Sequence, residues 1–238
     1  MKTITNFAVA LLMGCTFFAC QKADDEIIDK KETIEIEIDS DGGKYTFASN
    51  TVSVISAPDK FNAEVVNNTI VGKYAGSTNA TIKSNNTTYE CVVKVKPSFT
   101  YYIDMIIYMG ISKNEIEKLY GTHTRINKST YYYKPLSSYL AEKEVAFTYD
   151  DNNKVIACAS YFTLYQMTNV VKHLQHRYAT YGISDGVAFY GNALDMDDAS
   201  VVVMCGIESA TVIYASQSIL KSKSSYSDDY IHLFADNQ

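Results

Sequence analysis

The chain has 238 residues, a formal net charge of −6 and a hydrophobic content of 47%. This apolar content predicts a folded protein, and the length suffices for one large or two modest domains. The acidic balance excludes the basic surface that nucleic-acid-binding proteins use, and it argues against flat adsorption on anionic lipid. The chain also contains 20 Tyr and no Trp, a balance that suits half-buried strands and adaptable binding surfaces.

Residues 1–19 have the composition of a secretory signal peptide. Lys2 supplies the positive charge, and Phe7–Met13 is an apolar core too short to span a bilayer, which needs roughly 20 apolar residues. Two cysteines follow, Cys15 and Cys20, each directly after a small residue. A small residue before cysteine is what a lipoprotein signal peptidase accepts, so each cysteine is a candidate for the lipid-bearing N-terminus of the mature chain.

The residues around the two cysteines favour different choices. Leu12, three residues before Cys15, is typical of the lipoprotein cleavage motif, whereas Cys20 is followed by a lysine and an acidic run. That run resembles the export signal that places Bacteroidota lipoproteins on the outer face of the outer membrane, and its residues are Lys22, Asp24, Asp25 and Glu26. We therefore predict lipidation of Cys20, with Cys15 as the alternative, and an acyl anchor in outer-membrane lipid facing the cell exterior.

Cleavage before Cys20 leaves about 219 residues (238 − 19), and the loss of Lys2 makes the formal net charge about −7. Residues 20–31 are polar and charged without a hydrophobic period, which predicts a solvated tether.

Three further cysteines, Cys91, Cys158 and Cys205, each lie within an apolar, strand-like run. An odd number is a poor disulfide framework, although the expected compartment permits disulfides. We expect buried free thiols that act as small hydrophobic groups, with a Cys158–Cys205 disulfide as the alternative.

Residues 32–97 read as a series of short strands. Thr33–Asp39 alternates strictly between apolar and acidic residues, which predicts a half-buried strand with isoleucines inward and glutamates outward. Six more strand-like runs follow, most of them separated by turn residues: Lys44–Phe47, Val52–Ile55, Ala63–Val66, Thr69–Val71, Asn79–Lys83 and Tyr89–Val95. This spacing predicts an all-β antiparallel sandwich.

The second half of this region carries a turn between Gly72 and Gly76, an alternating strand, a polar hairpin and a final Val-x-Val-x-Pro that ends at Pro97. This order resembles the end of a bacterial Ig-like domain. The resemblance implies an Ig-like sandwich over residues 32–97 that serves as a spacer or adhesive stalk. Pro97 closes the domain because proline cannot donate a hydrogen bond to a strand ladder.

Residues 98–238 contain the same helix-start pattern twice. Ser112 and Glu115 form a capping box, and the helix they begin is expected to end at Gly121. Thr163 and Gln166 repeat the capping box, and this second helix is expected to end at Gly182. Its apolar face consists of Met167, Val170, Val171, Leu174 and Tyr178.

Three strand-like runs follow each helix. They are Thr130–Lys134, Glu144–Tyr149 and Lys154–Phe162 in the first copy, and Gly186–Tyr190, Ser200–Gly206 and Ala210–Ala215 in the second. Both copies therefore read as α-β-β-β, which predicts an α+β domain whose two helices cover one face of an antiparallel sheet. At the C-terminus, Lys221–Asp229 is polar, and Tyr230–Phe234 is a candidate final edge strand.

The first copy contains Met109-Gly110-Ile111-Ser112, then Glu115-Ile116 and Tyr120-Gly121. This motif resembles the tandem repeat of β-lactamase-inhibitor-protein-like domains, a fold shared by small outer-membrane-assembly lipoproteins. The family's usual proline after the helix glycine is replaced here by Thr122. The resemblance implies a tandem-repeat fold, and in the inhibitor-like relatives the concave sheet face is the docking surface.

No cofactor, metal site or catalytic residue is predicted. His173 and His176 form an H-x-x-H pair without a nearby Glu or Cys, and we expect both on a solvated helix face. Two acidic runs, Asp39 with Asp41 and Asp195 with Asp197 and Asp198, lack the spacing of a calcium loop and read as turns. Nucleophile, phosphate-binding and dinucleotide motifs are absent from the sequence, so we expect a protein that is not an enzyme.

Tyr131, Tyr132 and Tyr133 are the candidate binding surface. In a strand the first and third tyrosine share one face and the second occupies the other, so one side can remain exposed to a partner. The alternative is that these rings fill the sheet of a protein without tryptophan.

The leading hypothesis is a non-catalytic surface lipoprotein that binds a protein through its α+β domain. A glycan-binding accessory of a polysaccharide-uptake system is the alternative, and an envelope enzyme or enzyme inhibitor is less favoured. Two or three parallel exposed aromatic rings would favour the glycan hypothesis.

Overall fold

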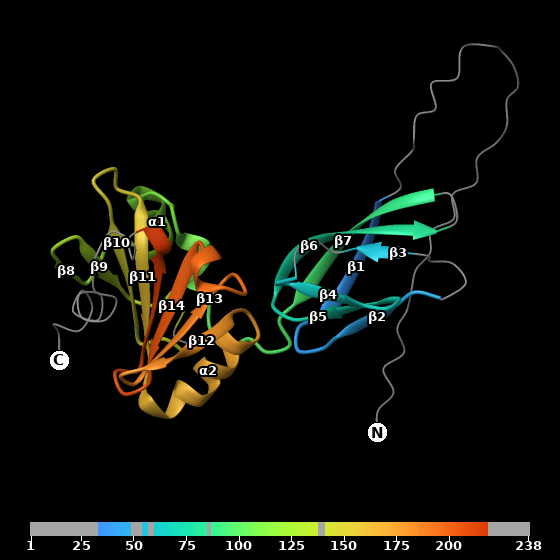
Figure 1. Ribbon diagram of the computed structural model, residues 1–238. Helices are drawn as coiled ribbons and strands as arrows, with labels where there is room; N and C mark the ends of the chain where they lie inside the picture. The colour runs from blue at the N-terminus through green and yellow to red at the C-terminus, as the bar shows by residue number, and fades with distance from the viewer. Residues whose placement is uncertain (1–32, 49–53, 57–59, 85–86, 138–140, 219–238) are drawn as a thin grey trace, which may run out of the picture. The chain divides into compact units, whose positions relative to one another are not determined.

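A computed structural model describes residues 33–48, 54–56, 60–84, 87–137 and 141–218 (Figure 1). The predicted signal peptide, both candidate lipidation cysteines, the predicted tether with its candidate export signal and the C-terminal 219–238 segment lie outside the described residues. Residues 31–238 form one unit. The separation of 32–97 from 98–238 at Pro97 therefore stays a prediction.

The first part of the described chain consists of seven strands. They are β1 (Thr33–Asp39), β2 (Lys44–Thr46), β3 (Val54–Ser56), β4 (Ala63–Val66), β5 (Thr69–Gly72), β6 (Gly76–Ser84) and β7 (Thr87–Lys96). A four-stranded sheet has the order β1-β7-β6-β3, and a three-stranded sheet has the order β2-β5-β4. Side chains of both sheets share one apolar core that includes Ile36, Ile70, Ile82 and Val93.

The alternating strand is confirmed. Ile36 and Ile38 are buried in the shared core, whereas Glu35 and Glu37 face solvent. Glu35 pairs with Lys94 at 2.9 Å and Glu37 pairs with Lys96 at 2.5 Å, both on the neighbouring strand β7. Such exposed pairs contribute little to stability, so the isoleucines fix the register of β1.

The expectation of a purely antiparallel arrangement is wrong for β1. This first strand runs parallel to the last strand, β7, with Thr33 opposite Glu90 and Asp39 opposite Lys96. Hydrophobic alternation sets which face of a strand is buried, but it is the same for either strand direction. The direction of β1 could therefore not be read from its residue pattern.

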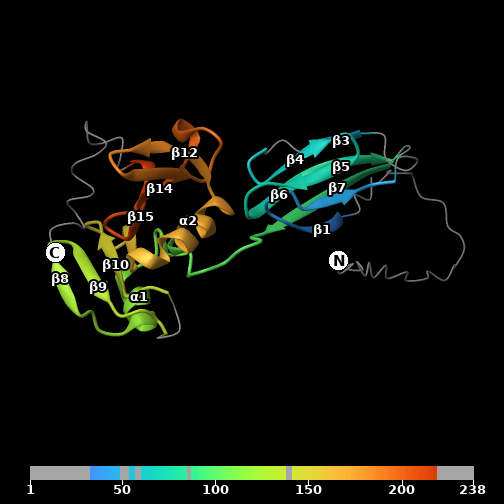
Figure 2. The same cartoon turned by 90° about the horizontal axis from the view of Figure 1, so that it is seen from below.

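The second part is an eight-stranded antiparallel sheet with two short helices. Its strands are β8 (Arg125–Asn127), β9 (Thr130–Tyr133), β10 (Glu144–Tyr149), β11 (Val155–Tyr161), β12 (Ala179–Ser184), β13 (Val187–Gly191), β14 (Val201–Gly206) and β15 (Thr211–Ser216). The helices are α1 (Lys113–Tyr120) and α2 (Met167–Gln175), and the 3-10 turns are η1 (Met105–Tyr108), η2 (Leu164–Gln166) and η3 (Met196–Asp198). The strand order is β12-β13-β14-β15-β11-β10-β9-β8, so β8 and β12 form the two edges (Figure 2).

The sheet consists of two equivalent halves that meet where β11 pairs with β15. Each half is a four-stranded meander preceded in the chain by one helix, α1 for β8–β11 and α2 for β12–β15. This arrangement agrees with the repeated helix-and-strands pattern of the sequence. The edge strands β8 and β12 were not predicted, so each half has four strands instead of three.

The predicted end of the second helix is also wrong. Helix α2 stops at Gln175, and Gly182 lies instead within β12, with a φ of +147°. The pairing of β12 with β13 shifts register between Thr180 and Gly182. This glycine therefore serves a strand irregularity, where positive φ has no Cβ penalty, rather than a helix cap.

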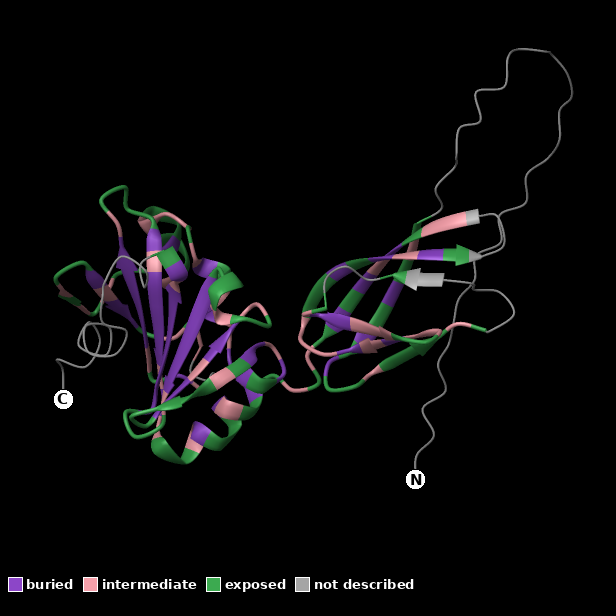
Figure 3. Ribbon diagram, viewed as in Figure 1, coloured by how far each residue is buried: buried purple, intermediate pink, exposed green. Residues whose placement is uncertain are grey.

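The two faces of the eight-stranded sheet carry separate apolar clusters. Both helices pack on one face, where Ile116 of α1 and Leu174 of α2 join the same cluster. The opposite face carries small side chains at its centre, which are Ala146, Ala157, Ala159 and Ala215. The central strands are buried along most of their length, whereas the helices keep an exposed side (Figure 3).

Candidate binding strand and the polar cluster beside helix α2

The three tyrosines of β9 occupy three different environments. Tyr133 belongs to the cluster on the helix side of the sheet and Tyr132 to the cluster on the opposite face, as the alternation predicts. Both are 0% exposed, so the expectation of an exposed side is not met by these two rings. Tyr131 is half-buried and is the one member of the trio at the surface.

Tyr132 is enclosed by an ion pair on one side. The Arg125 guanidinium lies 3.4 Å from the centroid of the Tyr132 ring. Arg125 in turn donates from Nη2 to Oε2 of Glu144 at 2.7 Å. The stacked cation and its carboxylate partner come from the two strands that flank β9, so Tyr132 stabilises the sheet edge rather than presenting a contact surface.

Tyr133 is an anchor of the aromatic layer under α1. Its ring packs against Phe147, with centroids 5.7 Å apart, and against Tyr120 at 5.9 Å. Its hydroxyl lies 3.4 Å from that of Tyr149. Burial raises the pKa of the Tyr133 hydroxyl, as expected for an ionisable group that is removed from water.

Tyr131 is surrounded by polar groups that reach the surface. The Lys113 ammonium lies 3.8 Å from its ring centroid, and the His123 ring meets it edge-on at 5.2 Å. Tyr149 also meets Tyr131 at a steep angle of 75°. We call Lys113, His123 and Tyr131 the Tyr131 patch.

The prediction that both histidines lie on a solvated face of α2 is wrong. His173 is 0% exposed and His176 is 8% exposed. The His173 ring stacks on Tyr102 at 3.9 Å, and His176, the residue directly after the helix, lies 6.3 Å from the Phe99 ring. The residues that cover this side of α2 precede it by more than 70 positions, so the helical period alone could not place them.

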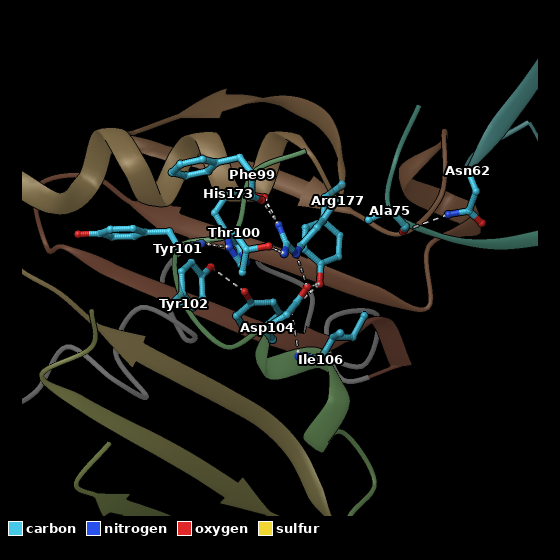
Figure 4. Close-up of polar contacts among 12 residues, drawn as sticks. Asn62, Ala75, Phe99, Thr100, Tyr101, Tyr102, Asp104, Ile106, His173 and Arg177 are labelled. Atoms are coloured by element: carbon cyan, nitrogen blue, oxygen red, sulfur yellow. Dashed lines mark hydrogen bonds and ion pairs between the residues drawn. The ribbon is translucent and has the colours of Figure 1, made fainter. Parts of the chain in front are cut away.

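A buried polar cluster lies next to His173 (Figure 4). The residue pattern did not predict this cluster. Both carboxylate oxygens of Asp104 accept from the Tyr178 hydroxyl, at 2.7 and 2.8 Å, and Arg177 Nε lies 3.5 Å from one of them. The hydroxyls of Tyr102 and Tyr214 are 2.7 Å apart. Burial raises the pKa of Asp104, against the opposing effect of its hydrogen bond from Tyr178.

One signal for this cluster was present in the sequence. Asp104 caps η1 by accepting from the Ile106 amide at 3.3 Å. An aspartate directly before a short apolar run is a known helix-start pattern. The pairing of that aspartate with Arg177 and Tyr178 depends on the fold and has no local signal.

Cys91, Cys158 and Cys205 are free and buried, so the alternative of a Cys158–Cys205 disulfide is not realised. Burial raises the pKa of Cys91 to about 11 and that of Cys205 to about 12. Burial also raises the pKa of Cys158. The nucleophile is the thiolate, which these shifts disfavour, so the three thiols have the character of buried hydrophobic groups.

The acidic runs behave as turns where the structure describes them. Asp195 caps η3 by accepting from the Asp197 amide at 3.0 Å, and Asp41 adopts a φ of +62° in the turn after β1. Among the described residues, no group of three His, Cys, Asp or Glu side chains could hold a metal ion. Helices long and apolar enough to cross a membrane are likewise absent from the described part of the chain.

Comparison with known proteins gives distant similarity of fold alone. No family model matches the chain, and no curated protein matches it. The C-terminal domain of TagH is 11% identical, with a TM-score of 0.29, over 74% of this chain and 98% of that one. Domains 1–6 of the surface layer protein SbsC are 11% identical, with a TM-score of 0.21, over 76% of this chain and 20% of that one.

Proposed function

We propose that this chain is a non-catalytic surface lipoprotein, anchored through Cys20, whose β-rich mature part binds a protein partner. The observation that carries the address is Cys20, which follows a small residue and is followed, after Gln21, by a lysine and an acidic run. The first seven strands would form an Ig-like stalk, which their two sheets around one core support. The eight-stranded sheet would be a tandem repeat, which its two equivalent halves support.

The contact surface in this proposal includes the Tyr131 patch. Tyr131 combines a partly exposed aromatic ring with a neighbouring cation, and aromatic and cationic residues are enriched at protein interfaces. The ring geometry favours a protein over a glycan. His123 and Tyr131 meet at 86°, so the rings do not form the parallel platform on which a sugar would stack.

Absence of catalysis is part of the proposal and has one physical support. The raised pKa values of Cys91 and Cys205 oppose formation of a thiolate at neutral pH. A cysteine–histidine mechanism at these positions would need the opposite shift.

The address is tested by surface staining of intact cells that express the full chain with a C-terminal epitope. We expect the wild-type protein to be stained. Changing Lys22, Asp24 and Asp25 together to alanine should retain lipidation but lose the staining, because the export signal is removed while Cys20 remains. Equal staining of both proteins would contradict a surface address set by these residues.

The class of ligand is tested separately with a glycan array probed by the mature chain carrying Cys20→Ser to prevent lipidation. The protein-binding proposal expects no specific glycan signal. Specific binding that is lost in Tyr131→Ala but kept in Tyr165→Ala, a change of a tyrosine that is 82% exposed, would support the glycan-binding alternative.

A further inference from the structure

Residues 99–104, here called the strap, are fastened to the C-terminal end of α2. Arg177 donates from Nη1 to the Phe99 carbonyl at 2.8 Å and from Nη2 to Thr100 Oγ1 at 2.7 Å. The backbone amide of Tyr101 donates to Nδ1 of His173 at 3.1 Å. Three consecutive strap residues are thus bound by two side chains that lie four positions apart, one helical turn, in the sequence (Figure 4).

The contact with Tyr101 fixes the protonation state of His173. A backbone N–H can only donate, so Nδ1 must be unprotonated and the imidazole neutral, with its hydrogen on Nε2. His173 is fully buried, and its Nε2 has no hydrogen-bond partner in the described structure. A proton on Nδ1 would convert this acceptor into a donor that faces another donor.

The charged groups around His173 do not favour the imidazolium. Arg177 adds a positive charge from the residues after α2, and His176 is a second titratable group on the same side. Lys172 lies 4.6 Å from the ring centroid of the strap residue Phe99.

The neighbouring carboxylate in the strap is that of Asp104, which is already bound by Tyr178 and Arg177. A second carboxylate, that of Glu142, accepts a hydrogen bond from the strap amide of Ile103, and burial raises its pKa. The hydroxyls of Tyr102, Tyr178 and Tyr214 also pack here, and Phe162 packs on Tyr102 without charge.

We propose that His173 is an acid-sensitive fastener, whose protonation releases the Tyr101 amide and detaches the strap from α2. The direction follows from linkage. Burial, with smaller contributions from Arg177 and His176, lowers the pKa of His173 from 6.5 to about 3 in the attached state. In a detached state with the imidazole in water, the pKa returns toward its ordinary value of about 6.5.

The attached state therefore has its full stability above about pH 6.5 and loses it progressively as the pH falls toward 3. Within this window, each decrease of one pH unit raises the ratio of detached to attached molecules by about tenfold. Asp104 and Glu142 act in the opposite direction, because the raised pKa of each carboxyl favours the attached state in acid. A measurement on the wild-type protein alone would sum these effects.

The experiment measures hydrogen exchange of the Tyr101 amide between pH 6.5 and 4.5, corrected for intrinsic exchange. This amide reports directly on its hydrogen bond to His173. The sample is the mature chain with Cys20→Ser. His173→Asn is the decisive variant, since the Asn Oδ1 can accept the same N–H without titrating. We expect protection to fall by about fiftyfold in the parent chain relative to His173→Asn. His123→Asn, which removes a half-buried histidine elsewhere, should behave like the parent chain, and the Phe147 amide in β10 should keep its protection throughout.

Equal pH dependence in the parent chain and His173→Asn would overturn the proposal, as would unchanged protection in both. If His173→Asn fails to fold, the nitrogen chemical shifts of the imidazole in the parent chain decide the question. We expect a neutral ring with the hydrogen on Nε2 down to pH 5. Titration of His173 near pH 6.5 in the folded protein would contradict it.

Discussion

Tyr131, Tyr132 and Tyr133 are consecutive residues with different neighbours, and their environments predict different effects of substitution. The Tyr132 and Tyr133 rings are fully buried in opposite clusters of the sheet. Tyr131 lies at the surface under Lys113. Tyr132 and Tyr133 are therefore structural residues, and Tyr131 is the candidate contact residue.

Alanine at Tyr132 or Tyr133 should lower the free energy of unfolding by about 3 kcal/mol or more, as for other buried aromatic residues. Tyr131→Ala should lower it by about 1 kcal/mol, the range of a partly exposed cation–π contact. Chemical denaturation of the three single variants measures these changes. The control, Tyr165→Ala, should stay within about 0.5 kcal/mol of the wild-type value because that ring is exposed. A Tyr133→Ala protein as stable as the control would contradict the assigned burial.

Burial of His173 and His176 could not be predicted from the sequence. The apolar stripe of α2 correctly identified Met167, Val170 and Leu174 as buried. It could not identify His173, because the strap that covers it lies far away in the sequence. The same limit applies to Asp104, whose partners become adjacent only after the sheet has formed.

At the scale of elements, local patterns predicted most strands because alternation and turn residues are local properties. Thr33–Asp39, Ala63–Val66 and Glu144–Tyr149 were predicted with the observed bounds. The edge strand β8 has three residues, too few to show alternation, and β12 contains a glycine that resembles a helix C-cap.

The first helix depends on its capping box. The amide of Ser112 donates to Oε2 of Glu115 at 3.1 Å, and the amide of Glu115 donates to Ser112 Oγ at 3.4 Å. Ser112→Ala should therefore lower the free energy of unfolding by about 1 kcal/mol. Thermal or chemical denaturation checks this value, and Asn114→Ala, an exposed change in the same helix, is the matched control. A smaller loss for Ser112→Ala than for Asn114→Ala would show that the cap does not stabilise α1.

For the whole molecule, the sequence predicts a domain boundary at Pro97, between residues 32–97 and 98–238. The strap adds a physical reason to expect the start of a stable fragment near Phe99, because Phe99 and Thr100 are bound by Arg177. Limited proteolysis followed by mass spectrometry should give a fragment that begins close to Phe99. Cleavage within Ser112–Gly121, or resistance along the whole chain, would contradict a boundary at this position.

The proposed surface address depends on lipidation of Cys20. Incorporation of a labelled fatty acid into the full chain, compared between Cys20→Ala and Cys15→Ala, tests it most directly. We predict that Cys20→Ala abolishes the label and that Cys15→Ala keeps it, since the lysine and acidic run follows Cys20. Loss of the label in Cys15→Ala with retention in Cys20→Ala would show that Cys15 is the lipidated residue.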